Sequence, residues 1–528
     1  MDFNKLKLYF NTVIYLKPVQ VFYRTYYFIR NKFFNVKVYK KLNFERKPIN
    51  WNDKLFSNTS YLYKTKTFKF LNISHKFLDN TDWNYSNYGK LWTYNLNYFD
   101  FLNQNNLPEK VGLELINNYV KNDKILKEGK EPYTISLRTI NWIKFLTKKK
   151  INNKIINDTL YTHCKILLKN LEYHLLGNHL LENAFSLLFG AYYFQDKKLY
   201  KCSKKILLKQ LDEQILNDGA HFELSPMYHQ IILSRLLDSI QLIKINNTWK
   251  KDNLISFLKQ KSSLMISWLY NITYSNGEIP MVNDATYKIA PNSKELFAYA
   301  EYLGINSQDV PLSDSGYRKI NSINYELLID IGKVGPSYQP GHAHSDTFNF
   351  ELIKNGIPVF VDTGISTYEK NSNRQKQRST YSHNTVKIGS KDQTQVWGGF
   401  RVAKRAKITH LIEKTNLIEA SHDGYLSDGY NHTRSFLWGE KELILIDKIN
   451  KSTSNNAKAF FHLHSSVIKP LVEGNYVMLE SLGLSIKFDK ASSVEIEKYQ
   501  LSEGFNKSSL AYKIVVIFDQ ILKTKISL

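Results

Sequence analysis

The sequence predicts a two-part α+β chain, in which a helical region is followed by an antiparallel β-sandwich. Between about residues 108 and 310, apolar residues recur three and four positions apart in one run after another. After about residue 320 the period changes to two. Residues 309–316 (DVPLSDSG) resemble a linker between these regions. We therefore expect a basic N-terminal helical segment at 1–50, a helical domain at 51–315 and a β-domain at 316–528.

The N-terminal segment is basic and aromatic. Residues 1–50 predict an amphipathic helix and a connector that ends near Pro48. No apolar stretch precedes a small-residue cleavage site, and no 18 uncharged apolar residues run together, so neither a secretory signal nor a membrane-spanning helix is expected. The part up to Phe34 fits either an anionic membrane surface or packing on its own domain. We expect a cytoplasmic or membrane-peripheral protein, with a periplasmic one as the alternative.

The second segment begins with an irregular, aromatic stretch at 51–105, and helical periodicity follows. Asparagine and glycine punctuate the helical runs, as helix ends require. Consecutive helices with short connections and no fixed sequence period favour a helical toroid or solenoid without copied repeats. The expected helices cover residues 111–120, 135–146, 155–176, 180–193, 227–245 and 254–270.

The third segment contains many short alternating runs and no helical pattern. So many strands predict a sandwich of two sheets. Asn355 and Gly356, between two such runs, predict a tight hairpin. The expected strands cover residues 325–331, 347–353, 386–388, 406–412, 417–421, 434–437, 443–449, 460–463, 476–479, 484–488 and 512–518.

The charge balance narrows the class of partner. The chain carries 72 Lys and Arg against 48 Asp and Glu, a net charge of +24, which favours nucleic acid, anionic lipid or an acidic polysaccharide. No nucleic-acid-binding module accompanies this charge, so no nucleic-acid partner is expected. Cys164 and Cys202 are the only cysteines, which excludes a disulfide framework and a thiolate zinc site.

A histidine cluster opens the β-rich region. His342 and His344 lie two positions apart, so on a strand their rings share one face. The hairpin at Asn355 brings Asp362 back beside them, and His383 follows. Two histidines and a carboxylate on neighbouring strands fit a zinc site, and satisfied structural histidines are the alternative.

Polar residues also gather at helix starts in the helical region. Asn178 and His179 follow Gly177 between two apolar helices, where free backbone N–H groups favour an anion, although plain capping by Asn178 is the alternative. Arg138 fits either an acidic ligand or a surface salt bridge.

A loop carrying His221 and Glu223 leads into a helix that starts near Pro226. Tyr228 and His229 follow at once. So many polar and aromatic groups at one helix start predict the wall of a cleft.

Together these stretches resemble the heparinase II/III-like family of bacterial polysaccharide lyases. They follow the family order over about residues 90–390. The resemblance implies an incomplete (α/α) toroid followed by an antiparallel β-sandwich. The matching pieces are residues 91–95 (LWTYN), 138–142 (RTINW), 177–179 (GNH), 218–223 (DGAHFE), 225–229 (SPMYH), 342–346 (HAHSD), 361–364 (VDTG) and 383–386 (HNTV).

The resemblance implies β-elimination on a uronic-acid-containing polysaccharide, in a cleft between the domains. Asn178, with His179, neutralises the uronate carboxylate, and Tyr228 serves as acid and, for some substrate stereochemistries, also as base. His342 matches the catalytic histidine, and Tyr368 a second tyrosine of some relatives. The implied zinc ligands are His344, Asp362 and His383, and the metal is structural. The expected substrate-binding residues are Trp92, Tyr94, Arg138, His221, Glu223 and His229.

Two other functions remain open. One is a non-catalytic polysaccharide-binding or assembly protein on the same fold. The other is a glycoside hydrolase, for which Glu223 and Asp284 are the candidate carboxylates. Residues 9–20 resemble family members associated with surface-polysaccharide biosynthesis, which implies capsule or O-antigen metabolism and contact with a membrane or assembly machinery. The sequence specifies no oligomeric state.

Overall fold

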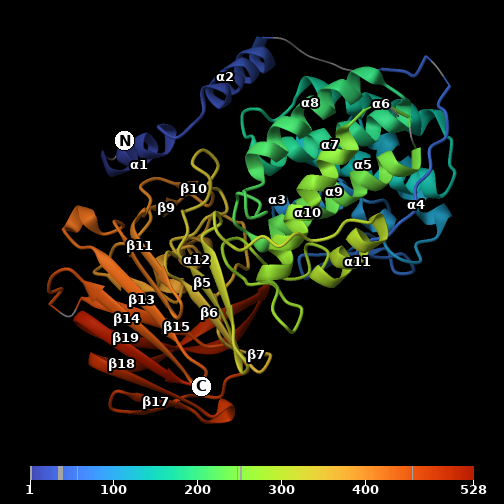
Figure 1. Ribbon diagram of the computed structural model, residues 1–528. Coiled ribbons are helices and arrows are strands. Elements are labelled where there is room, and N and C mark those ends of the chain that lie inside the picture. The colour runs from blue at the N-terminus through green and yellow to red at the C-terminus, as the bar shows by residue number, and fades with distance from the viewer. Residues whose placement is uncertain are drawn as a thin grey trace.

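The structure is a computed structural model that describes residues 3–33, 40–43, 45–55, 57–246, 248–249, 252–454 and 456–528. It confirms the predicted α+β architecture, with the helical domain and the β-domain side by side (Figure 1). The predicted N-terminal helical segment contains two helices, α1 (Phe3–Val13) and α2 (Pro18–Phe33). Residues 1–2, 34–39 and 44 of that segment, Phe34 among them, lie outside the described residues.

All six predicted helices of the helical domain are present, and α3, α8 and α11 are additional. The helix predicted over 155–176 ends at Lys169, where Asn170 leaves the helical conformation. Helix α8 was missed because lysines interrupt its apolar period. The helices are α3 (Lys90–Tyr98), α4 (Glu109–Asn122), α5 (Pro132–Lys148), α6 (Lys154–Lys169), α7 (Gly177–Phe194), α8 (Lys197–Gln214), α9 (Pro226–Asn246), α10 (Leu254–Ile272) and α11 (Ser293–Leu303).

Helix α7 is the centre of this domain. It is apolar on all sides, and His179 is the one residue of its 18 that is not buried. Its neighbours are α5, α6, α8 and α9. The stretch predicted as irregular contains α3 and a small sheet of β1 (Tyr61–Leu62), β2 (Thr67–Phe70) and β3 (Ile73–Lys76).

The β-domain consists of two main antiparallel sheets. The smaller has the order β4 (Tyr317–Asn321), β5 (Tyr325–Asp330), β6 (Phe350–Lys354) and β7 (Ile357–Phe360). The larger sheet contains β11 (Ile408–Lys414), β12 (Leu417–His422), β13 (His432–Trp438), β14 (Glu442–Ile449), β19 (Lys507–Ser527), β18 (Leu484–Gly504), β17 (Tyr476–Leu479) and β16 (Leu471–Glu473). Strand β15 (Ala457–His462) also pairs with β19, and β8 (Val386–Ile388) pairs with β15.

The backbone φ angles explain the predicted hairpin and the start of the strand that precedes it. Asn355 and Gly356 both have positive φ, 50° and 77°, which is the conformation of the predicted two-residue hairpin between β6 and β7. The strand predicted over 347–353 starts only at Phe350, because Phe348 has a φ of 68° and the preceding residues form a loop. Strands β18 and β19 are each 21 residues long, far beyond their predicted apolar centres.

The smaller sheet is buried on both faces, and this joins the two domains. Leu327 and Ile329 of β5 belong to the core shared with the larger sheet. Leu328 between them, with Tyr317 and Ile353, belongs to the core of the helical domain. Alternate residues therefore pack against different domains, as the period of a strand requires.

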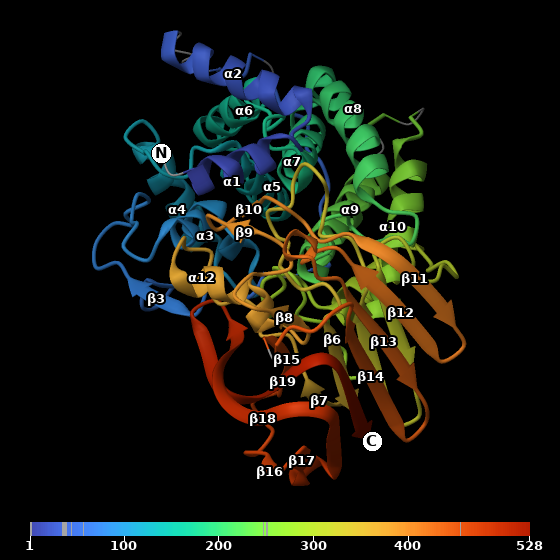
Figure 2. The ribbon, with the colours of Figure 1, turned by 90° about the vertical axis from the view of Figure 1, so that its left-hand side faces the viewer.

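Helices α1 and α2 lie across the two domains at one end of the molecule (Figure 2). Helix α1 lies on the β9 (Val396–Trp397) and β10 (Arg401–Val402) hairpin, where Tyr9 packs edge-on against Trp397. Helix α2 lies on the helical domain, where Tyr23 stacks on Tyr173. Within the described chain, no helix combines the length and apolarity that a membrane span requires.

Candidate active site

A cleft of about 2290 Å³ lies between the helical domain and the β-domain. It is lined by α3, α5, α7 and α9 on the helical side, and by α1 and loops of the β-domain on the other. The structure brings all five residues expected to be catalytic to its wall. These are Asn178, His179, Tyr228, His342 and Tyr368.

The centre of the cleft is an aromatic pair from different domains. Tyr228, in the first turn of α9, stacks on His342 with ring centroids 3.9 Å apart. The hydroxyl of Tyr228 lies 3.1 Å from that of Tyr368. Burial, and then the neighbouring Tyr368, raise the pKa of Tyr228 well above its usual value. The phenol therefore keeps its proton at neutral pH and can donate it.

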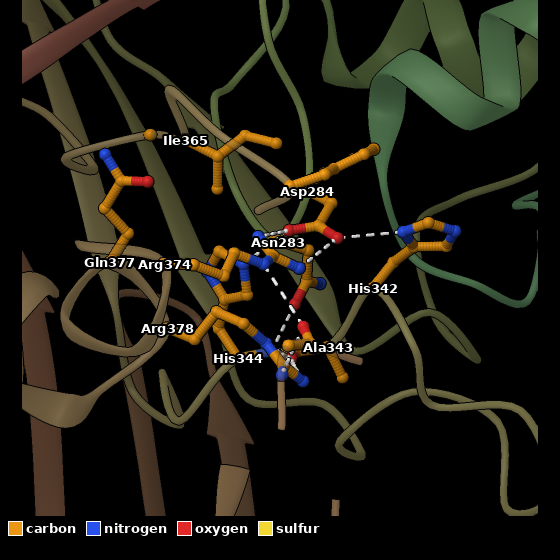
Figure 3. Close-up of polar contacts among 12 residues, drawn as sticks. Asn283, Asp284, His342, Ala343, His344, Ile365, Arg374, Gln377 and Arg378 are labelled. Atoms are coloured by element: carbon orange, nitrogen blue, oxygen red, sulfur yellow. Dashed lines mark hydrogen bonds and ion pairs between the residues drawn. The ribbon is translucent and has the colours of Figure 1, made fainter. Parts of the chain in front are cut away.

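Asp284 fixes the orientation of His342. Its Oδ2 lies 2.8 Å from Nδ1 of His342, and its Oδ1 lies 2.9 Å from Nε2 of His344. Arg374 donates to both oxygens of Asp284, at 2.5 and 2.6 Å (Figure 3). Burial alone would raise the pKa of Asp284, but Arg374 and the two histidines lower it well below its usual value.

An ionised carboxylate only accepts hydrogen bonds, so Nδ1 of the neutral His342 ring carries the hydrogen and Nε2 is left as an acceptor. Nε2 lies 3.6 Å from Oε2 of Glu223. An imidazolium formed by proton uptake at Nε2 would therefore lie between two carboxylates, Asp284 at Nδ1 and Glu223 at Nε2. This arrangement suits His342 to act as a general base.

Arg378 holds the loop that carries the histidines. Its Nε and Nη2 donate to the Ala343 carbonyl at 3.2 and 2.8 Å, and Nη1 donates to the Gly399 carbonyl at 2.8 Å. The predicted strand geometry of this loop was wrong. His342 lines the cleft, whereas His344 is fully buried outside it, because the loop does not alternate as a strand does.

The opposite wall of the cleft is the N-terminus of α7. The backbone N–H and the Nδ2 of Asn178 donate to Glu223, at 3.0 and 2.7 Å. Nδ2 has two hydrogens, so one remains for a ligand in the cleft. Gly177 has a φ of 57°, and a Cβ there would lie 2.7 Å from Oε1 of Glu223. Glycine therefore permits the Asn178–Glu223 contact.

His179 lies beside Asn178, in surroundings that favour its protonated form. Its Nδ1 lies 3.1 Å from Oε1 of Glu172. Burial lowers the pKa of His179, but Glu172 outweighs this effect and the net pKa is raised. Together with the helix N-terminus, the ring favours an anionic group at this wall.

A cluster of three buried ligand atoms lies behind His342. One atom each of His344, Asp346 and His383 lies within 4.8 Å of the others. Nδ1 of His344, Oδ2 of Asp346 and Nε2 of His383 are all buried and have no hydrogen-bond partner. Burying three such atoms without a partner is costly, and imidazole nitrogen and carboxylate oxygen are ligands of zinc. The residues present therefore fit a metal ion.

The other nitrogen of each histidine is fixed by a carboxylate. Asp284 accepts from Nε2 of His344, and Asp362 lies 2.8 Å from Nδ1 of His383. Such partners orient metal-binding histidines. The predicted set named Asp362 as a ligand, but its oxygens face His383, Asn349 and the Gly364 N–H, and Asp346 takes its place in the cluster.

Four of the residues expected to bind substrate are core residues that do not line the cleft. Trp92 donates to the Ile73 carbonyl, and Arg138 donates to the carbonyls of Asn97 and Gly129. The structure corrects these assignments, since polar or aromatic type alone does not distinguish a binding residue from one that satisfies buried backbone. The four are Trp92, Arg138, His221 and His229.

The ring nitrogens of His221 and His229 are likewise used within the protein. His221 lies 3.0 Å from the Gln214 side chain, and His229 lies 3.0 Å from the Met265 carbonyl. Glu223 is also buried and outside the cleft lining, and it accepts two hydrogen bonds from Asn178. Tyr94 does line the cleft, and its hydroxyl donates to Glu131 at 2.8 Å.

Several cleft residues were not predicted. Arg235 lies seven residues after Tyr228 on α9, so helical periodicity places both on one face, and this signal was available in the sequence. Arg401 and Arg405 come from the loop around β10, whose position depends on the fold. The unpredicted lining residues include Tyr98, Tyr133, Arg235, Phe400, Arg401 and Arg405.

Comparisons with known proteins agree with this architecture. A family model described as "Heparinase II/III N-terminus" matches residues 22–309, and one described as "Heparinase II/III-like, C-terminal" matches residues 305–527. A heparin-sulfate lyase of Bacteroides stercoris is 27% identical over 258 residues, 42% of this chain and 37% of the relative. One of Pedobacter heparinus is 22% identical over 372 residues, 63% of this chain and 54% of the relative. The alignments thus span about half or less of these relatives' length.

Solved structures show the same fold. A crystal structure of heparinase III superposes with a TM-score of 0.65 at 16% identity, covering 96% of this chain and 91% of that one. The Streptomyces coelicolor chondroitin AC lyase in complex with chondroitin sulphate gives a TM-score of 0.51 at 9% identity, covering 83% and 74%. These similarities confirm the incomplete toroid followed by a β-sandwich.

Proposed function

The chain belongs to the heparinase II/III family, and from this premise we propose that it is a polysaccharide lyase acting on a uronic-acid-containing polymer by β-elimination. The observation that carries the proposal is the pair of Tyr228 and His342 in the cleft. Tyr228 retains a phenol proton that it can donate, and His342 presents Nε2, which can accept a proton. Elimination needs both functions at neighbouring atoms of the sugar.

The proposed reaction uses the two walls of the cleft together. Asn178 and His179, whose pKa is raised by Glu172, bind the uronate carboxylate and stabilise the charge that spreads into it when the C5 proton leaves. Nε2 of His342 takes that proton. The electron pair of the C5–H bond forms the C4–C5 double bond, the C4–O4 bond breaks, and Tyr228 protonates O4. The products are an unsaturated uronate and a new sugar end.

The acidic class of the substrate is supported by charge. The chain has a net charge of +24, and Arg235, Arg401 and Arg405 reach the cleft lining. Arg405 is nearly buried, and its Nε and Nη2 have no hydrogen-bond partner. The guanidinium stacks on the Tyr15 ring at 3.9 Å, and its Nε and Nη2 hydrogens remain free to donate to an anion in the cleft. We further propose a role in surface-polysaccharide metabolism, which rests on the resemblance of residues 9–20.

The hydrolase alternative has no support in the arrangement of its carboxylates. Asp284 accepts four hydrogen bonds and is fully buried, and Glu223 is bound to Asn178. Neither carboxylate lines the cleft. Hydrolysis requires two carboxyl groups that flank the scissile bond.

The direct test is ultraviolet absorbance of the purified protein with a panel of uronate polymers, including the surface polysaccharide of its own source. Elimination produces a 4,5-unsaturated uronate that absorbs, so we expect a rise with at least one acidic polymer. New reducing ends without absorbance would show hydrolysis instead. No reaction with any polymer, combined with measurable binding, would favour the non-catalytic alternative.

A zinc ion at His344, Asp346 and His383 is also proposed, in a structural role. When bound, it would neutralise the buried carboxylate and join the loop that carries His342 to the rest of the β-domain. Substitution Asp346→Asn is expected to abolish stoichiometric zinc and to lower the thermal midpoint. Substitution Asp362→Asn leaves the three ligand atoms and is expected to weaken zinc binding by about 10–100-fold.

Metal content by atomic absorption and thermal unfolding with and without a chelator would measure both effects. The surface carboxylate Asp309 offers a control, and Asp309→Asn should change neither quantity. Equal zinc loss from the Asp346 and Asp362 variants would contradict the ligand set. A thermal midpoint that does not respond to the chelator would contradict the structural role.

A further inference from the structure

The outer face of α1 and α2 is unusually apolar. Ten of the thirty large hydrophobic side chains exposed in the described part of the chain lie within residues 3–33. Phe10, Phe22 and Phe28 are 68%, 63% and 68% exposed. We call this set the N-terminal apolar face. It comprises Leu6, Phe10, Val13, Ile14, Val21, Phe22, Tyr26, Phe28, Ile29 and Phe33.

These side chains form a stripe on each helix. Leu6, Phe10 and Val13 are spaced by four and three residues on α1, which places them on one side. Phe22 and Ile29 repeat the spacing on α2, with Tyr26 between them. Such a concentration of exposed apolar side chains along two neighbouring helices is typical of an interaction site.

The opposite sides of both helices are attached to the protein. Nε1 of Trp397 donates to Oγ1 of Thr12 at 3.1 Å. Gln20 donates to the Leu175 carbonyl at 3.1 Å, and Tyr27 donates to the Leu171 carbonyl at 2.6 Å. These directional contacts hold α1 on the β-domain and α2 on the helical domain. The N-terminal apolar face is therefore the side of the two helices that stays exposed after they have packed on the protein.

Charge distinguishes among the possible occupants of this face. Residues 3–33 contain six basic residues and no Asp or Glu. Lys5, Lys7 and Lys32 are exposed, and the ammonium of Lys32 lies near the rings of Phe28 and Phe33. A symmetric dimer would place this basic surface against its own copy, which is repulsive. An anionic lipid surface complements both the charge and the apolar stripe.

We propose that the N-terminal apolar face docks on an anionic lipid bilayer. The phenylalanines enter the boundary between headgroups and acyl chains, and the lysines contact the anionic headgroups. Helix α1 lies outside the residues matched by the family models, and its Tyr9, Thr12 and Val13 line the cleft, Val13 at the border between the cleft and the N-terminal apolar face. Docking would therefore hold one end of the cleft beside the lipid surface.

Sedimentation with vesicles tests the proposal on the full chain. We expect the protein to sediment with vesicles of phosphatidylcholine and phosphatidylglycerol, and much less with phosphatidylcholine alone or at high salt. The variant Phe10→Ser/Phe22→Ser/Phe28→Ser should bind the anionic vesicles at least about a hundredfold more weakly, since it removes three large apolar groups from the contact. None of these three residues lines the cleft.

A matched control lies at the other end of the molecule. Leu471 and Tyr476 are 50% and 47% exposed on the β16–β17 hairpin (Figure 2). The variant Leu471→Ser/Tyr476→Ser should bind vesicles as the unaltered protein does. Equal thermal midpoints would show that all variants are folded.

Three results would overturn the proposal. These are no binding to anionic vesicles, equal binding by the triple phenylalanine variant, and a wild-type dimer that the triple variant dissociates while lipid binding is absent. The last result would assign the face to self-association. Since sedimentation needs no catalysis, these outcomes are independent of whether the protein is a lyase.

Discussion

Replacing Tyr228 by phenylalanine is expected to lower kcat/KM by about 10²–10⁴-fold, the usual contribution of a general acid. The substitution removes the hydroxyl and keeps the ring, so the stacking on His342 at 3.9 Å is preserved. The Tyr228 hydroxyl contacts one side chain, that of Tyr368, so little stability should be lost. The loss would then belong to proton transfer rather than to folding.

Initial rates from ultraviolet absorbance and the thermal midpoint would be measured together. Tyr368→Phe is the matched control, because it removes the other hydroxyl of the same pair and should reduce activity less. A Tyr228→Phe enzyme that keeps more than about a tenth of the activity would contradict the assigned acid.

The pH dependence offers a second measurement on the same residue. Because the folded pKa of Tyr228 is raised above about 10, the phenol stays protonated throughout the neutral range. The wild-type rate should therefore show no alkaline decline from this group below about pH 10. An alkaline decline near neutral pH that disappears in Tyr228→Phe would contradict this expectation.

Substitution Asp284→Ala should have the largest effect on stability. The carboxylate accepts hydrogen bonds from His342, His344 and Arg374 and is fully buried. Its removal leaves the Arg374 guanidinium as an uncompensated buried charge. Breaking such a pair costs about 3–5 kcal/mol of the free energy of unfolding. Activity should be lost as well, since the tautomer of His342 is no longer fixed.

The sign of the pH dependence follows from the lowered pKa of Asp284. A carboxyl whose pKa is depressed by folding stabilises the folded state above its unfolded pKa, about 3.9, and loses that effect as the pH falls through the folded value. The cost of Asp284→Ala should thus be the same from about pH 6 to 8 and shrink only in strong acid.

Denaturant unfolding of Asp284→Ala, Arg374→Met and the double variant would separate the cost of an unpaired buried charge from the cost of lost packing. The double variant should recover part of the lost stability, because no unpaired buried charge remains, and it should stay inactive. Additive losses in the double variant would contradict the charge argument. Recovery of activity would contradict the role of Asp284 in orienting His342.

The sequence was sufficient for the architecture and for the cleft residues of α7 and α9. Periodicity marks whether a segment is a helix or a strand, and Asn178, His179 and Tyr228 lie at helix starts that glycine and proline identify. It was insufficient where a loop decides the geometry. Residues 342–346 were treated as a strand, but they form a loop, and the next strand begins only at Phe350. The predicted ligand set therefore named Asp362, whereas the cluster of buried ligand atoms contains Asp346.

The sequence also could not predict which polar side chains are buried. Arg138 and His221 have the types and positions of binding residues, yet both lie in the core. Nothing local in a sequence distinguishes a polar side chain that satisfies buried backbone from one that faces a ligand. Asp284, conversely, lies in a loop far from both histidines in the chain, and only the tertiary fold brings it to them.

The doubly buried sheet has a consequence for the modularity of this chain. The two family matches meet at residues 305–309, which suggests two exchangeable modules. A chain cut there would expose the side of the sheet that carries Tyr317, Leu328 and Ile353, and would open the core of the other half. The hydroxyl of Tyr317 also donates to the Leu224 carbonyl of the helical domain at 2.8 Å. The two halves should therefore unfold as one cooperative unit, and a chimera between relatives must carry the sheet together with the helices that cover it.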